Sequence, residues 1–381
     1  MLPDRNRTAW DTVGTTLPTA EPTCAQTVGA PTGTDSTAIQ SAINTAATAY
    51  AALVNKTGVA CYVTLGAGTL RIYDSGDNLV DTIDLGLNQG NNAQTRTIAG
   101  ATYYTYPVIV RSNTAAIYPH LGVLTSNTTY YVLADAGFFK DAVNASLPAI
   151  TSSSTWSFTT KVTGPDSSVT NDVLVNADGS GDFVTLQGAI DWVPAGNTTP
   201  RTITLKKGVY EEINRIPSGK NNLTFIGEGY QESIITYANN NTFQLANAGT
   251  ATRVMFYAGG NDCVFKNLWF ANSTPQGGSQ AESIRVQGLR TILDNCKFTS
   301  FQDTILINTA NNVTFSSTVQ TTGNVTQSAG TGTTTFNGTS GTGISGNLAV
   351  TTDAITLSTS QLTTVGTVNL NAQNAITFNT T

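Results

Sequence analysis

The sequence predicts an all-β protein in which a β-sandwich precedes a parallel β-helix. First, short runs of Val, Ile, Thr, Tyr and Phe alternate with Gly, Asn, Asp and Ser, residues typical of strands and turns respectively. Second, a strand unit with a polar or Asn-containing turn recurs at residues 221–229, 261–273, 290–303 and 311–319. Repeated short strands of this kind indicate stacked coils of a β-solenoid. Third, charged residues make up only 11% of the chain, which is typical of exported β proteins.

The N-terminal part divides into a helical and a strand-rich segment. Residues 1–58 contain a predicted helix, because Asp35 or Ser36 offers a cap and the apolar residues that follow recur at helical spacing. Residues 59–161 hold six short apolar runs separated by turn residues, which predicts a β-sandwich. Residues 162–172 are rich in Gly, Pro, Ser and Asp, so we expect a linker there.

The remaining chain is expected to form the solenoid. Residues 173–330 open with a strand, a Gly-rich turn and a helix over 186–193 that a proline ends. Asn267 and Asn295 occupy equivalent points of two repeat units, which predicts a stacked Asn ladder. Residues 331–381 are rich in Thr, Gly and Asn with spaced apolar residues, so we expect further thin coils, with disorder as the alternative. No terminal cap is evident, and we expect the chain to be truncated.

Charge and hydropathy exclude several functions. The net charge is −6 and no Lys/Arg cluster occurs, which argues against a nucleic-acid partner. No apolar run approaches membrane-spanning length, and the first ten residues lack the apolar core of a signal peptide. The composition nevertheless favours an extracellular or cell-surface location. We expect a monomer.

The few cysteines and the single histidine restrict the chemistry. By their order in the chain, Cys24 and Cys61 could form a disulfide. The alternative is that all four cysteines, including Cys263 and Cys296, are buried thiols. Because no CxxC spacing exists, a zinc site is not expected. We expect no other metal site and no cofactor. A Ser-His-Asp or Cys-His site would have to use His120. We expect this histidine at the surface or at a strand end instead.

Residues 173–306 resemble pectinesterases. The motifs occur in the order of that family: "DGSGDFVTLQGAID", "GVYEE", "NNLTFIGEG", "NNTF", "SQAESIRV" and "FQDTIL". The resemblance implies a right-handed, single-stranded parallel β-helix of the pectin-lyase-like type. It also implies hydrolysis of the methyl esters of polygalacturonate, with pectin or a related acidic polysaccharide as partner. The segments "LTSNTTYYVLADAGFFKD" and "STWSFTTK" resemble bacterial Ig-like domains, which implies a spacer module and a bacterial origin.

The same resemblance assigns roles to individual residues. Gln280 and Gln302 would stabilise the oxyanion that forms during ester cleavage, and Asp303 would be the general acid/base. A turn residue of the fold is the alternative role for Asp303. The resemblance and the aromatic content imply substrate contacts at Tyr210, Glu212, Thr242 and Phe243, with Tyr257 and Trp269 as further aromatic candidates and the core as the expected place of Trp269.

Two parts of the family pattern are missing. The family's nucleophilic aspartate lies in a motif whose best match is "GNVTQSAG", where its position falls on Thr326. No Asp or Glu occurs between Asp303 and Asp353, and no arginine follows Arg290, so the family's arginine motif is absent. Glu282 lies on the same strand face as the first glutamine and is a possible replacement. We therefore expect a pectinesterase-like enzyme with impaired turnover. The alternative is a non-catalytic, extracellular polysaccharide-binding or adhesin-like solenoid.

Overall fold

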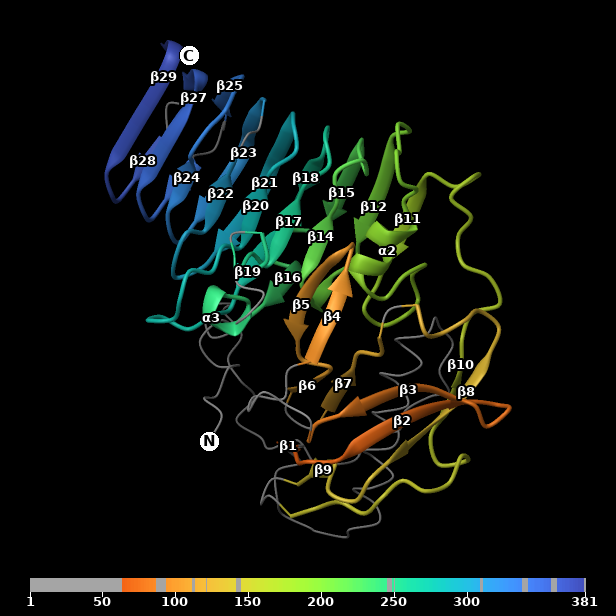
Figure 1. Cartoon of the computed structure of the whole chain (residues 1–381). Coiled ribbons are helices and arrows are strands. Elements are labelled where there is room, and N and C mark those ends of the chain that lie inside the picture. Colours follow the sequence, from red (N-terminus) through yellow and green to blue (C-terminus); the bar gives the residue numbers. More distant parts are fainter. Residues whose placement is uncertain are drawn as a thin grey trace.

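The computed structural model of the protein has two β-rich parts (Figure 1). The predicted N-terminal helix and the Cys24–Cys61 pair lie outside the residues that the structure describes. No helix among the described residues is long and apolar enough to cross a membrane. The described residues are 64–86, 94–111, 114–120, 122–141, 145–244, 249, 251–308, 311–337, 342–357 and 362–379.

The first part is an antiparallel β unit with its own core. Its largest sheet has four strands in the order β10-β8-β2-β3. The core of this part includes the buried residues Leu70, Ile72, Tyr130 and Trp156. Three two-stranded pairs accompany this sheet. The described strands do not show the two-sheet arrangement of an Ig-like domain, which stays a prediction. The strands are β1 (Thr64–Leu65), β2 (Thr69–Asp74), β3 (Leu79–Asp84), β4 (Gln94–Ile98), β5 (Ala101–Thr105), β6 (Val108–Arg111), β7 (Thr114–Ile117), β8 (Thr129–Ala134), β9 (Phe139–Lys140) and β10 (Ser157–Thr159).

The second part is a parallel β-helix, as the sequence predicts. All strand pairs from β11 to β29 are parallel, and from β12 onward the coils visit three faces in turn. Parallel crossovers of this kind are right-handed. Each face is defined by the strands that stack on it.

Face A begins with β11 (Asp172–Val175), β12 (Arg201–Leu205), β15 (Leu223–Gly227) and β18 (Val264–Lys266). Face B contains five short strands: β13 (Gly208–Glu211), β16 (Ser233–Tyr237), β19 (Trp269–Asn272), β26 (Thr342–Ile344) and β28 (Leu362–Thr364). The second halves of two longer strands lie between β19 and β26. Those longer strands are β21 (Thr291–Thr299) and β23 (Val313–Thr321), whose first halves continue face A together with β25 (Thr333–Asn337).

Face C consists of β14 (Asn214–Ile216), β17 (Phe256–Ala258), β20 (Ile284–Val286), β22 (Ile305–Ile307) and β24 (Val325–Gln327). The first halves of β27 (Leu348–Leu357) and β29 (Val368–Phe378) extend it, while their second halves return to face A. The strands therefore continue through the described part of the Thr/Gly/Asn-rich C-terminal segment.

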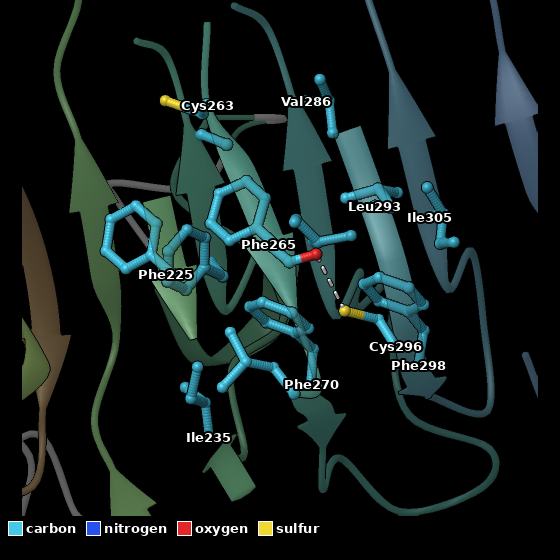
Figure 2. Close-up of a cluster of buried hydrophobic side chains, with 14 of the residues drawn as sticks. Phe225, Ile235, Cys263, Phe265, Phe270, Val286, Leu293, Cys296, Phe298 and Ile305 are labelled. Atoms are coloured by element: carbon cyan, nitrogen blue, oxygen red, sulfur yellow. Dashed lines mark hydrogen bonds between the residues drawn. The ribbon is translucent and has the colours of Figure 1, made fainter. Parts of the chain in front are cut away.

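Stacked phenylalanines fill the interior of the β-helix (Figure 2). Phe225 stacks on Phe265 with ring centroids 5.0 Å apart, and Phe270 stacks on Phe298 at 5.2 Å. The Sγ of Cys296 donates to the carbonyl oxygen of Phe265, so this thiol is a core group. Burial raises the pKa of both Cys263 and Cys296 to about 12, and both are free thiols.

A helix covers the first coil. Helix α2 (Leu186–Trp192) confirms the predicted helix, and the Thr185 hydroxyl accepts from the Gly188 amide as its N-cap. Its apolar residues belong to the core of the β-helix. The predicted linker is fixed at this end, because Trp192 donates to the Pro165 carbonyl and Arg201 donates to two further linker carbonyls, those of Ser167 and Thr170. It is therefore not a free spacer.

The two parts share a contact surface at the β4–β5 hairpin, which lies against the β-helix (Figure 1). Tyr103 is buried in the same core as the stacked phenylalanines. The Tyr104 amide donates to Gln244 Oε1 at 2.9 Å, and the Tyr106 amide donates to Tyr237 Oη at 2.7 Å. The hairpin therefore forms part of the surface around faces B and C.

The coils differ in the number of residues they contain, and the additional residues lie at one corner of the β-helix. Thr334 pairs with Ile355, and Ile355 with Ile376, each 21 residues apart. Thr224 and Val264 pair across 40 residues, and Val264 and Ile292 across 28. The extra residues follow β16 and β19, where the chain turns from face B to face C. After the first coil, this corner carries the longest connections, one of which contains helix α3 (Asn241–Gln244).

Candidate active site

Three loops meet at the corner between faces B and C. The Asn241 amide donates to the Gln280 carbonyl at 3.0 Å, and the Thr242 amide donates to Ser279 Oγ at 2.7 Å. Gln302 Nε2 donates to the Gly278 carbonyl at 3.0 Å. These bonds gather the predicted residues Thr242, Gln280 and Gln302 at one place, with Asp303 adjacent in the chain.

Gln280 is held by an arginine that the sequence did not single out. Arg253 Nη1 donates to Gln280 Oε1, so the amide oxygen points at the guanidinium. The amide nitrogen of Gln280 makes no hydrogen bond with a described residue, and the side chain is exposed. This orientation leaves an N–H donor facing outward, which an oxyanion stabiliser requires.

Glu282 is a structural residue and not a replacement nucleophile. It is 0% exposed, and Arg253 Nε lies 2.8 and 2.9 Å from its two carboxylate oxygens. A nucleophile has to reach the ester carbon, and a buried carboxylate paired on both oxygens cannot do so. The hypothesis that Glu282 replaces the missing aspartate is therefore wrong.

Asp303 has an unusual backbone and a free carboxylate. Its φ is 40°, in the left-handed region that few non-glycine residues adopt, although Asp and Asn are enriched there. The side chain is half-buried, and its carboxylate has no hydrogen bond or ion pair with any residue the structure describes. An unpaired, partly accessible carboxylate is available for proton transfer.

The position that the family's nucleophile would take is occupied by a half-buried threonine. Thr326 lies on β24 of face C, in register with Leu306 and Ala349, and points outward between two buried neighbours. The next carboxylate in the chain, Asp353, lies where β27 turns from face C to face A and is hydrogen-bonded to Asn374. It is therefore at a different corner from Asp303.

Two predicted substrate contacts, Tyr210 and Glu212, are bonded to the fold itself. Tyr210 is 2% exposed, and its hydroxyl donates to the carbonyls of Val175 and Lys206. Glu212 accepts from the Leu186 and Gln187 amides at 2.7 and 2.9 Å, at the start of helix α2. Burial raises the pKa of Glu212, and these hydrogen bonds oppose that shift. Tyr210 therefore supports the fold from the interior, while Glu212 is half-buried and holds the start of helix α2, and its role as a substrate contact stays a prediction.

The remaining aromatic candidates differ in whether their side chains are buried or face outward. Phe243 on α3 packs against Tyr106 from the hairpin, with ring centroids 4.9 Å apart. Trp269 is buried, but it lies in a small cluster on the outer side of face B with Ile234, and not in the main core. Lys297 covers its ring at 3.8 Å. Of the aromatic candidates, Tyr257 on face C is half-buried and faces outward.

The single histidine is far from this corner, in the antiparallel unit. Its Nδ1 lies 2.7 Å from Asp81 Oδ1, and its backbone amide donates to Asp81 Oδ2. The Asp81 hydrogen bond raises the pKa of His120. His120 is thus a half-buried ion-pair residue.

The fold and this corner define a class: a parallel β-helix protein with two glutamines and an aspartate on the loops that lead into face C. Residues 172–340 match the Pectinesterase family model, which confirms the resemblance for that part of the chain. Pectinesterase 31 of Arabidopsis thaliana is 38% identical over 144 residues, which cover 35% of this chain and 45% of the relative. Pectinesterase 4 of the same plant is 35% identical over 147 residues, covering 38% and 24%. The chain thus spans less than half the length of these curated relatives.

Two solved structures of pectin methylesterases align with about half of the chain. Pectin methylesterase PemA from Erwinia chrysanthemi has 23% identity and a TM-score of 0.40, covering 49% of this chain and 65% of that one. Pectin methylesterase from carrot has 18% identity and a TM-score of 0.36, covering 52% and 83%. Because the curated relatives named above are plant proteins, the bacterial origin stays a prediction.

Proposed function

We propose that the chain is a pectinesterase-type carbohydrate esterase that hydrolyses methyl esters of polygalacturonate outside the cell. The match of residues 172–340 to the Pectinesterase family model is the observation that carries this proposal. The gathering of Gln280, Gln302 and Asp303 at one corner supports it. Pectin is the partner that this activity requires.

Gln280 and Asp303 have different roles in the proposed reaction. The outward amide N–H of Gln280 stabilises the negative charge that develops on the ester carbonyl oxygen. Asp303 is the general acid/base and moves the proton between the attacking water and the leaving methanol. Because Thr326 has no adjacent base to activate it, it is a poor nucleophile, and direct attack by water is the remaining route. We expect slow turnover for this reason.

Methanol release from highly methylated pectin tests the proposal. Gln280→Leu should lower the rate about a hundredfold, the usual loss when one oxyanion donor is removed. Gln320→Leu is the matched control, since Gln320 is an exposed glutamine on face B. No methanol from correctly folded wild-type protein would favour the non-catalytic, polysaccharide-binding alternative.

A further inference from the structure

The β4–β5 hairpin of the antiparallel part covers the first strands of face C (Figure 1). Tyr103 on β5 is fully buried, and its hydroxyl accepts from Arg215 Nη1 at 3.4 Å. Arg215 lies on the outer side of β14, and its guanidinium covers the ring of Tyr257 on the neighbouring strand β17 at 4.0 Å. The hairpin therefore occupies the outer side of face C over these two strands.

Buried polar groups of the β-helix hold the hairpin in place. Gln244 is 0% exposed, and its side-chain amide accepts from the Tyr104 amide at 2.9 Å and donates to the Tyr104 carbonyl at 3.2 Å, as a neighbouring strand would. The Tyr103 hydroxyl donates to the Ala251 carbonyl at 3.2 Å. Undocking would expose a buried aromatic ring and leave these groups without partners, which is costly. The hairpin is thus a fixed part of the surface.

The hairpin lies directly beside the corner that carries the candidate active site. Helix α3 connects the two, because Gln244 at its end holds β5 while Asn241 at its start donates to the Gln280 carbonyl at 3.0 Å. At a rise of about 1.5 Å per residue, these two residues are about 4.5 Å apart along the helix. Gln280 is therefore about one helical turn away from the hairpin.

Face C becomes accessible at the strand that follows Asp303. Arg285 on β20 is only 8% exposed. The residues in register with it on the next four strands are half-buried or exposed and carry no charge: Leu306, Thr326, Ala349 and Asn369. The first of these strands, β22, begins two residues after Asp303. Asp303 therefore lies at the border between the covered and the accessible part of face C.

We propose that the hairpin ends the substrate-binding surface beside the active site, so that the protein removes methyl esters from terminal units of the polymer. This inference rests on the proposed function. A polymer that lies along β22 to β29 with one ester at Asp303 meets covered strands on the other side, about 4.8 Å away at the usual strand spacing. An internal unit needs room in both directions, whereas a terminal unit needs it in only one.

Limited digestion of fully methyl-esterified hexagalacturonate, tagged at its reducing end, tests this inference, with tandem mass spectrometry locating the first free acid. Wild type should remove an ester near one terminus about tenfold faster than an internal ester, the order of discrimination that a few lost contacts give. Tyr103→Ala/Gln244→Ala removes the anchors of the hairpin and should bring the two rates close together. Trypsin cleavage after Arg96, half-buried on β4, reports release of the hairpin.

Tyr130→Ala is the matched control, because Tyr130 is an equally buried tyrosine in the core of the antiparallel part. It should keep the terminal preference. Equal rates at terminal and internal units in wild type would overturn the inference. An unchanged preference in a folded double variant that trypsin cleaves after Arg96 would also overturn it. If circular dichroism shows that the double variant does not fold, Gln244→Ala alone takes its place.

Absence of methanol release from wild type would contradict the proposed function but would still allow a test of the hairpin. Isothermal titration calorimetry with the same hexamer then decides. Release of the hairpin should tighten binding about tenfold, because additional sugar units gain contact with face C. Unchanged affinity in the double variant would overturn the inference.

Discussion

The buried pair of Arg253 and Glu282 gives a prediction with a large expected effect. Glu282→Gln keeps the shape of the side chain and removes its charge, which leaves the guanidinium buried without a counter-ion. Glu282 is 0% exposed and Arg253 is 9% exposed, so solvent cannot take over the lost interaction. Removing one partner of such a pair costs about 3–5 kcal/mol. We expect the free energy of unfolding to fall by about that amount.

Urea unfolding followed by circular dichroism measures this change. The control is the double variant Arg253→Met/Glu282→Leu, which replaces the pair with apolar groups and should recover most of the loss. A change below about 1 kcal/mol in Glu282→Gln would refute the structural role. Loss of methanol release with unchanged stability would instead show that Glu282 takes part in the chemistry.

Two further predictions concern the core and the histidine pair. Phe270 is fully buried between Phe256 and Phe298. Phe270→Ala should lower the free energy of unfolding, measured in urea, by about 3–5 kcal/mol, and a loss below about 1 kcal/mol would contradict the stacked core. Because Asp81 raises the pKa of His120, their pairing stabilises the fold fully below about pH 6.5 and is lost as the pH rises through the higher folded-state pKa. Thermal unfolding of His120→Gln should therefore differ from wild type more at pH 6 than at pH 9, and the opposite trend would argue against this ion pair.

The repeat of the β-helix could be predicted because it is a local pattern. Asn267 and Asn295 occupy equivalent turns, and the structure confirms their ladder: Asn295 Nδ2 donates to Asn267 Oδ1 at 2.7 Å, with φ values of 56° and 50°. Alternation of apolar and polar residues likewise marked the strands that carry Phe265 and Phe298. The turn chemistry and the period of two are properties of a few consecutive residues, so a single sequence displays them.

The support of the site could not be predicted, because it depends on residues from separate loops. Arg253 and Glu282 are 29 residues apart, and nothing near either residue indicates the other. Tyr210 and Glu212 were recognised as part of a motif, but their side chains serve the core and helix α2. The docking of the hairpin through Tyr103 likewise joins segments that are far apart in the chain. Long-range side-chain pairing leaves no periodic signal.

The rate of methanol release by Asp303→Asn relative to wild type tests the central claim most directly. The substitution keeps the size of the side chain and removes its capacity to exchange a proton. The account predicts measurable release by wild type and a loss of at least a hundredfold in the variant, with the circular dichroism spectrum unchanged. Equal rates for the two proteins would contradict the assignment of the active site to the corner between faces B and C.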